Sequence, residues 1–143
     1  MLYQGSSSLN LDGKGRMSVP ARHRESLQVQ CEGRLTLTKH PHGCLVMFPR
    51  PIWEAYRETI AGWPLQALAW KRIFMGSAMD VDIDGAGRLL VPPELRTAAQ
   101  LDKEITLMGM GSHLEIWDAA IQARKEAEAI AAGMPDSIAG MSF

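Results

Sequence analysis

Long apolar runs, cysteines and aromatic residues are all scarce in this chain of 143 residues. No stretch approaches the roughly 18 apolar residues that cross a bilayer, so we expect no membrane-spanning segment. The first residues show no charged start followed by an apolar run, so no secretory signal is expected. Two cysteines, Cys31 and Cys44, are too few for a disulfide scaffold. These absences favour a cytoplasmic protein with one packed core.

An excess of one charge sign is also missing, because 15 Lys+Arg and 16 Asp+Glu leave a net charge of −1. Taken alone, this value argues against a nucleic-acid-binding protein, which is usually basic. The sum conceals two opposite halves: residues 1–72 carry a net +5 and residues 73–143 a net −6. This asymmetry predicts that the two halves contact different partners, with chance distribution over a solvated surface as the alternative.

The chain contains an internal repeat. The nine residues from Asp12 to Pro20 realign with those from Asp84 to Pro92 at an offset of 72, and six of the nine are identical. Segments further along realign at offsets of 70 and 69, as small deletions in loops produce. Two copies are too few for a solenoid, so they predict a duplicated module with pseudo-twofold symmetry.

Each copy predicts the same order of elements. Alternating apolar and polar residues predict strands at 9–11 and 81–83, and each Asp-Gly-x-Gly predicts a tight turn with a return strand after it. The helices predicted from proline and capping signals lie near residues 20–27, 49–62, 92–99 and 118–132. The predicted strand pairs are 34–39 with 44–48 and 104–109 with 113–117.

The two Asp-x-x-x-Arg turns, each followed by Val-Pro and an Arg, resemble the MraZ family of bacterial transcriptional regulators. The resemblance covers residues 1 to about 120. It implies a β-rich α+β fold, in which two tandem AbrB-like repeats (SpoVT-AbrB domains) form one swapped-hairpin, pseudo-twofold β-barrel with flanking helices. It also implies a non-enzymatic, nucleoid-associated repressor of the division and cell-wall gene cluster, including its own gene. Such a protein binds short direct repeats in double-stranded DNA as a homo-oligomeric ring.

The expected organisation has four parts. A basic, DNA-facing first repeat occupies residues 1–62, and a connector occupies 63–76. The second repeat occupies 77–132, and a flexible tail occupies 133–143.

The predicted DNA-binding residues are the cations near the two turns. They are Lys14, Arg16, Arg22, Arg24, Arg88 and Arg96, with Asp12, Gly15, Asp84 and Gly87 orienting the turns. Lysine and arginine contact phosphates, and arginine also reads guanine through two hydrogen bonds. An intramolecular Asp–Arg salt bridge is the alternative role for these arginines, and the basic surroundings of Arg16 favour DNA contact there.

The first copy holds more charge than the second. Lys14, Arg22 and His23, which we expect on the same basic surface, are replaced by Ala86, Glu94 and Leu95 at the offset of 72. The first repeat is therefore expected to make most of the phosphate contacts.

Two other features admit further functions. One alternative is a metal-binding module or a small β-barrel enzyme that uses His40, His42 and Cys44. This cluster lacks a fourth ligand at a defined spacing. We therefore predict no metal, cofactor, catalytic residue or small-molecule substrate. An antitoxin-like barrel that binds a protein through its C-terminal tail is another. The aromatic residues around the connector are interpreted either as core or as subunit contacts: Trp53, Trp63, Trp70 and Phe74.

Overall fold

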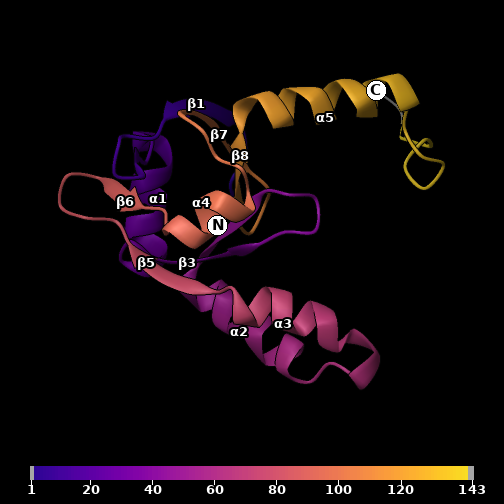
Figure 1. Ribbon diagram of the computed structural model, residues 1–143, viewed down its shortest axis with the longest axis horizontal. Coiled ribbons are helices and arrows are strands. Elements are labelled where there is room, and N and C mark those ends of the chain that lie inside the picture. Colours follow the sequence, from indigo (N-terminus) through magenta and orange to yellow (C-terminus); the bar gives the residue numbers. More distant parts are fainter. Residues whose placement is uncertain (1, 142–143) are drawn as a thin grey trace.

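The computed structural model describes residues 2–141, which form two copies of one strand–helix arrangement (Figure 1). The first copy consists of β1 (Ser6–Asn10), β2 (Arg16–Ser18), α1 (Ala21–Cys31), β3 (Arg34–Lys39), β4 (Leu45–Pro49) and α2 (Arg50–Ala61). A short 3-10 helix, η1 (Leu65–Ala67), and α3 (Leu68–Gly76) follow within the predicted connector. The second copy consists of β5 (Met79–Asp82), β6 (Arg88–Leu90), α4 (Pro93–Ala98), β7 (Glu104–Gly109), β8 (Leu114–Asp118) and α5 (Ala119–Ala132). The fold is therefore α+β and rich in strands, as the sequence predicted.

The two copies exchange strands. The larger sheet has the order β1-β7-β8-β4-β3-β5, so the first strand of each copy pairs with the other copy. β4 and β8 meet at the centre, with Val46 opposite Glu115, and related strands lie outward from them on both sides. The second sheet consists of β2 and β6 alone. This exchange confirms the swapped, pseudo-twofold arrangement, which is built from a six-stranded sheet and a two-stranded ribbon.

The sequence pattern suggested that each return strand pairs with the strand just before it. The structure shows different pairing. Asp12 N–H donates to Arg16 O across the first turn, at 2.9 Å, but β1 then pairs with β7 and β2 with β6. Met17 and Leu89 lie opposite each other in the ribbon and are both buried. Burial of these two side chains against the larger sheet favours the exchanged pairing, because apolar surface removed from water stabilises it.

The main core lies between the two sheets and is nearly symmetric. Alternate side chains of four strands are fully buried in it: Leu35, Leu37, Leu45, Met47, Ile105, Leu107, Leu114 and Ile116. The period of two that this alternation follows is the one that directs side chains to a single face of a strand. The sequence repeat is therefore matched by a repeat in the core.

Helix α1 is longer than the predicted 20–27 and continues to Cys31. It buries His23, Leu27 and Cys31, which are spaced four residues apart on one face of the helix. It ends where Glu32 adopts a left-handed conformation and Gly33 N–H donates to Leu27 O. This C-terminal motif stops the helix, and no earlier residue supplies one.

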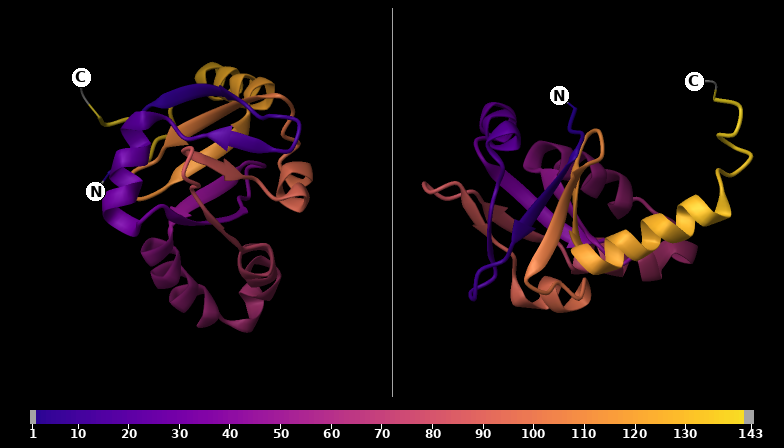
Figure 2. Two further views of the ribbon diagram at one scale, coloured as in Figure 1. Left: turned by 90° about the vertical axis from the view of Figure 1, so that its left-hand side faces the viewer. Right: turned by 90° about the horizontal axis from the view of Figure 1, so that it is seen from above.

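A second, smaller core lies on the outer face of β4. Val46 and Phe48 point to this face and contact Trp53 and Ile60 of α2. Trp63 and Phe74 are partly buried there, which places them and Trp53 in the core. Trp70 differs, because its side chain is 45% exposed. Figure 2 shows α2 and α3 as a helical hairpin that extends from the sheets.

Helix α5 extends away from the sheets (Figure 1). The Asp118 side chain accepts a hydrogen bond from Ile121 N–H, which confirms the predicted N-cap, and none of the residues of α5 is buried. Residues 136–140 of the predicted tail form turns, whereas residues 142–143 and residue 1 lie outside the described part. Within residues 2–141, no helix is long and apolar enough to cross a membrane.

Candidate nucleic-acid interface

The first turn is organised by Asp12. Its Oδ1 accepts hydrogen bonds from the backbone N–H groups of Lys14 and Arg16, both at 2.9 Å, and its Oδ2 accepts one from Arg16 Nε at 2.7 Å. The bond from the Arg16 backbone and the other bonds that favour the carboxylate lower the pKa of Asp12 to about 2. Because the ion pair uses Nε, the two terminal amino groups of Arg16, which arginine uses for two-point recognition, are not consumed by it.

The second turn repeats this pattern with a looser ion pair. Asp84 Oδ1 accepts hydrogen bonds from Ala86 N–H at 2.8 Å and Arg88 N–H at 3.0 Å. The same bonds lower the pKa of Asp84. Arg88 Nε lies 3.9 Å from Asp84 Oδ2 and has no hydrogen-bond partner among the described residues. The backbone geometry is therefore conserved between the copies, while the side-chain pairing is weaker in the second.

The ribbon of β2 and β6 brings the two turns together. Val19 N–H donates to Gly87 O and Val91 N–H to Gly15 O, each at 2.9 Å. Arg16 pairs with Leu90 in the ribbon, and Arg88 with Ser18. Residues 72 positions apart in the sequence therefore belong to one surface.

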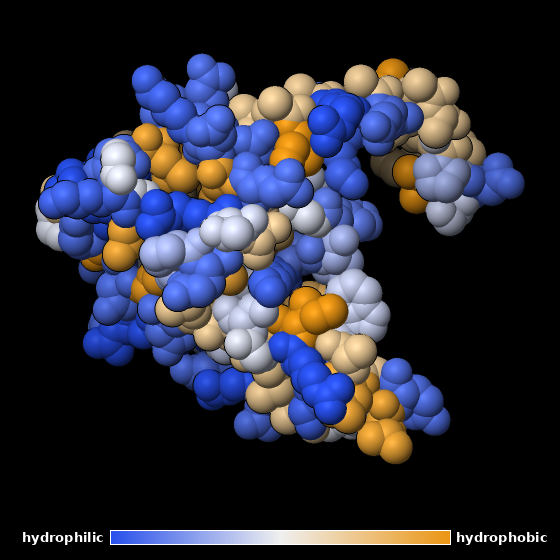
Figure 3. Space-filling model, viewed as in Figure 1, coloured by the Kyte–Doolittle hydropathy of each residue, from blue (hydrophilic) through white to orange (hydrophobic). Residues whose placement is uncertain are grey.

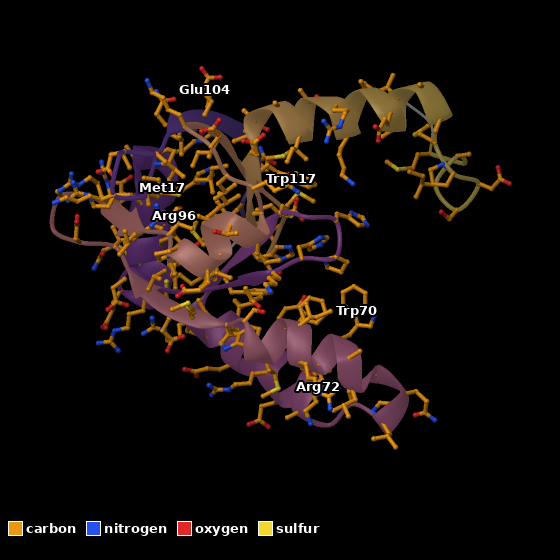
Figure 4. The ribbon with its side chains drawn as sticks, in the orientation of Figure 1. Met17, Trp70, Arg72, Arg96, Glu104 and Trp117 are labelled. Atoms are coloured by element: carbon orange, nitrogen blue, oxygen red, sulfur yellow. The ribbon has the colours of Figure 1, made fainter. Side chains whose placement is uncertain are left out.

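An arginine from each copy covers the turn of the other copy. A Cβ atom at Gly15 would lie 2.4 Å from Arg96 Cζ, and one at Gly87 would lie 2.0 Å from Arg24 Nη1. Both glycines are buried under these side chains and have positive φ angles, of 84° and 78°. The helices α1 and α4 thus add Arg24 and Arg96 to the two-turn surface. Figure 4 shows Arg96 and Met17 of the ribbon toward the same end of the molecule.

Five of the six predicted cations lie at this surface, and one does not. Lys14 and Arg24 are exposed, whereas Arg16, Arg88 and Arg96 are partly exposed. Arg22 instead contacts the N-terminal segment, where its Nη2 donates to Ser6 O at 3.1 Å and Ser7 Oγ at 2.8 Å. Figure 3 shows that hydrophilic residues predominate at the end of the molecule that carries the turns.

His23 was expected on the basic surface, and this expectation is wrong. Its side chain is 4% exposed and lies in α1 beside the Tyr3 ring. Burial lowers the pKa of His23 and so favours the neutral form of the ring. The helical period explains the difference, because His23 shares the buried face with Leu27 while its neighbours Arg22 and Arg24 point outward.

One exposed cation near the first turn was missed by the sequence analysis. Lys103 accepts a hydrogen bond at its carbonyl from Leu11 N–H, at 2.8 Å, just before Asp12. It lines a shallow surface depression together with Arg96 and Asp12. Lys103 lies outside both copies of the nine-residue motif, so only the strand exchange reveals that it belongs here.

Comparison with known proteins identifies the family. The sequence model of the family described as "MraZ protein, putative antitoxin-like" matches residues 2–72 and again residues 73–135. The chain belongs to the MraZ family. The "Transcriptional regulator MraZ" of Herminiimonas arsenicoxydans is 65% identical over 142 residues, which cover 99% of this chain and all of that protein. The proteins of the same name from Janthinobacterium sp. (strain Marseille) and Cupriavidus pinatubonensis are 61% and 62% identical over the same coverage. This MraZ-family chain is thus a transcriptional regulator built from two copies of one module.

Proposed function

We propose that this chain is a sequence-specific DNA-binding repressor and that the two-turn surface contacts the DNA. The observation that carries the proposal is the convergence of five cations from four segments: Lys14, Arg16, Arg24, Arg88 and Arg96. Lysine and arginine side chains supply the phosphate contacts that dominate affinity for DNA. Arginine terminal groups on a rigid turn are also suited to reading base edges.

The proposed target follows from the family. It is a set of short direct repeats upstream of the division and cell-wall gene cluster, which includes the gene for this chain. One chain presents a single small surface, so its binding to one repeat is weak. A homo-oligomeric ring makes contact with each further repeat effectively intramolecular and raises the overall affinity by orders of magnitude.

The ring requires exposed apolar surface for contacts between subunits. The helical hairpin offers Leu65 and Trp70, which are 81% and 45% exposed. Trp70→Glu is expected to reduce the oligomer size in native mass spectrometry. Met110→Glu, at a side chain with 46% exposure on another part of the molecule, is the control and should leave the oligomer intact.

Binding of DNA from the region upstream of the chain's own gene tests the function. Arg16→Ala is expected to weaken binding by about fivefold or more, about 1–3 kcal/mol, in fluorescence anisotropy. Arg72→Ala is the matched control, because Arg72 is an exposed cation on α3, far from Arg96 (Figure 4). Equal affinities for the Arg16 and Arg72 variants would remove Arg16 from the interface. A parent protein that does not prefer this DNA over unrelated DNA would contradict the proposed function.

A further inference from the structure

Three side chains with metal-binding groups meet on the opposite side of β4 from the main core. They are His40, just after β3, Cys44, just before β4, and Glu115 in β8. One ligand atom of each lies within 4.8 Å of the other two. Cys44 is 2% exposed and Glu115 is 8% exposed, so a thiol and a carboxyl group are buried side by side. The DNA-binding surface uses none of the three.

The fold fixes the positions of these groups. The turn between β3 and β4 is closed by hydrogen bonds from His40 N–H to Cys44 O at 3.1 Å and from Gly43 N–H to His40 O at 3.0 Å. These bonds hold His40 and Cys44 across one tight turn. The pairing of β4 with β8 places Glu115 opposite Val46, two residues beyond Cys44. The site therefore exists only because the two copies pair through β4 and β8.

A hydrogen bond from Trp117 orients the carboxylate of Glu115. Trp117 Nε1–H donates to Glu115 Oε1 at 2.9 Å, and the other oxygen, Oε2, lies 3.7 Å from His40 Nε2. In a tetrahedral site with bonds of about 2.0–2.2 Å, nitrogen and oxygen ligands lie about 3.4 Å apart. The observed separation is thus close to one edge of such a site. A second group that orients a ligand is a usual feature of metal centres.

From this arrangement we infer that His40, Cys44 and Glu115 form a binding site for a zinc-like divalent cation, with solvent as the fourth ligand. Imidazole, thiolate and carboxylate are the three ligand types that zinc takes in proteins. The partly exposed His40 and the exposed turn at residues 41–43 give the ion a path from solvent. The sequence pattern had pointed to His42 as the third ligand, and the structure places Glu115 there instead.

Two protons move when the ion binds. In the metal-free site, His42 N–H donates to His40 Nδ1 at 3.0 Å, so the ring proton is on Nε2 and faces Glu115. Coordination through Nε2 transfers the ring proton to Nδ1, and the bond from His42 N–H must then open. The thiolate is the form of cysteine that binds a metal, so coordination displaces the proton of the buried Cys44 thiol to solvent. Binding therefore releases one proton and changes the conformation of the turn.

Three other titratable groups lie around the site. His42 lies against His40 with ring centroids 5.0 Å apart, His113 interacts with Glu115, and Lys125 of α5 interacts with Cys44. At the offset of 69, His113 stands where the first copy has Cys44, so the two copies do not make two equivalent sites. We therefore expect one ion per chain.

Titration of the full-length, reduced protein with Co²⁺ tests the inference. We expect one Co²⁺ per chain, with a near-ultraviolet thiolate-to-cobalt band that Zn²⁺ abolishes. Cys44→Ser should remove the band, and Cys31→Ser is the matched control because Cys31 is the other buried free cysteine. Absence of the band in the parent protein, or its persistence in Cys44→Ser, would overturn the site.

Two further variants keep the test independent of any folding defect at Cys44. Trp117→Phe keeps an aromatic ring but removes the donor to Glu115, and it should weaken Zn²⁺ binding by about 10–100-fold. His42→Ala retains the backbone N–H and should leave Zn²⁺ affinity unchanged. The backbone amide signal of His42 should shift on Zn²⁺ addition in the parent protein. A greater loss of affinity in His42→Ala than in Trp117→Phe would refute the assignment of Glu115.

Discussion

The two turns share one backbone and differ in their charge. In each, an aspartate Oδ1 accepts two backbone hydrogen bonds, and an arginine of the other copy covers a glycine. The ion pair of the first turn measures 2.7 Å and that of the second 3.9 Å. Lys14 has Ala86 as its counterpart. The difference teaches that the duplicated scaffold keeps the aspartates and glycines in both copies, whereas the added cations are separable from it, as the proposed DNA contact requires.

The largest expected effect concerns the glycines that both turns share. Gly15→Ala and Gly87→Ala should each lower the free energy of unfolding by about 1–2 kcal/mol, because an L-residue is strained at a positive φ. Gly15→Ala should cost more, since the half-buried Arg96 above it has less room to move than the exposed Arg24. Urea unfolding measures the change. Gly13→Ala and Gly85→Ala are the controls, because a Cβ there meets nothing within 4 Å, and an equal loss in them would contradict the argument.

The two covering arginines provide the next comparison. Arg96 Nε donates to Val91 O at 3.0 Å, so Arg96→Ala should reduce stability by about 1 kcal/mol. Arg24→Ala removes an exposed side chain and should stay within about 0.5 kcal/mol of the parent. We expect both variants to bind DNA less tightly. The structural alternative for Arg96 would be supported, and its DNA contact rejected, if Arg96→Ala lost stability but kept the parent's affinity for DNA.

The difference in charge between the two turns is tested by substitutions at Lys14 and at its counterpart Ala86. Lys14→Ala should reduce the slope of log affinity against log salt concentration by about one, because one phosphate contact is lost. Ala86→Lys adds a cation at the matching place in the second turn. It should raise the slope by about one if that turn also faces the phosphate backbone. An unchanged slope in Lys14→Ala would show that the first turn does not contact phosphate.

Local patterns predicted the elements well but not their partners. The repeat and its alternating residues predicted the strand pairs 34–39 with 44–48 and 104–109 with 113–117, which the structure confirms within a residue or two. Alternation tells which face of a strand is buried but not which strand lies beside it. The exchanged ladders therefore followed from the family resemblance and not from the pattern.

The same reason explains the candidate residues that the sequence analysis missed. Lys103 reaches the first turn, and Glu115 reaches His40, only through pairing between the two copies. Neither residue belongs to a recognisable short motif. His23 was misplaced for a different reason: three consecutive residues, His23 with Arg22 and Arg24, were assigned to one surface although a helix directs them to different faces.

His23 and its counterpart Leu95 provide the smallest expected effect. Both are buried at matching positions, but the Nε2 atom of His23 has no hydrogen-bond partner among the described residues. Burial lowers the pKa of His23 in the folded state, so the unfolded chain binds a proton more readily. Stability contributed by the neutral ring is therefore present above the unfolded pKa of about 6.5 and is lost as the pH falls below it.

His23→Leu places the side chain of the second copy into the first. The variant should lose less stability than the parent between pH 7.5 and pH 5.0, measured by urea unfolding. His40 and His113, whose pKa values burial also lowers, remain in both proteins, so the difference between the two pH profiles isolates His23. Identical profiles would mean that His23 is not held neutral by burial. A flatter profile with unchanged DNA affinity would show that this departure from symmetry has no part in contacting DNA.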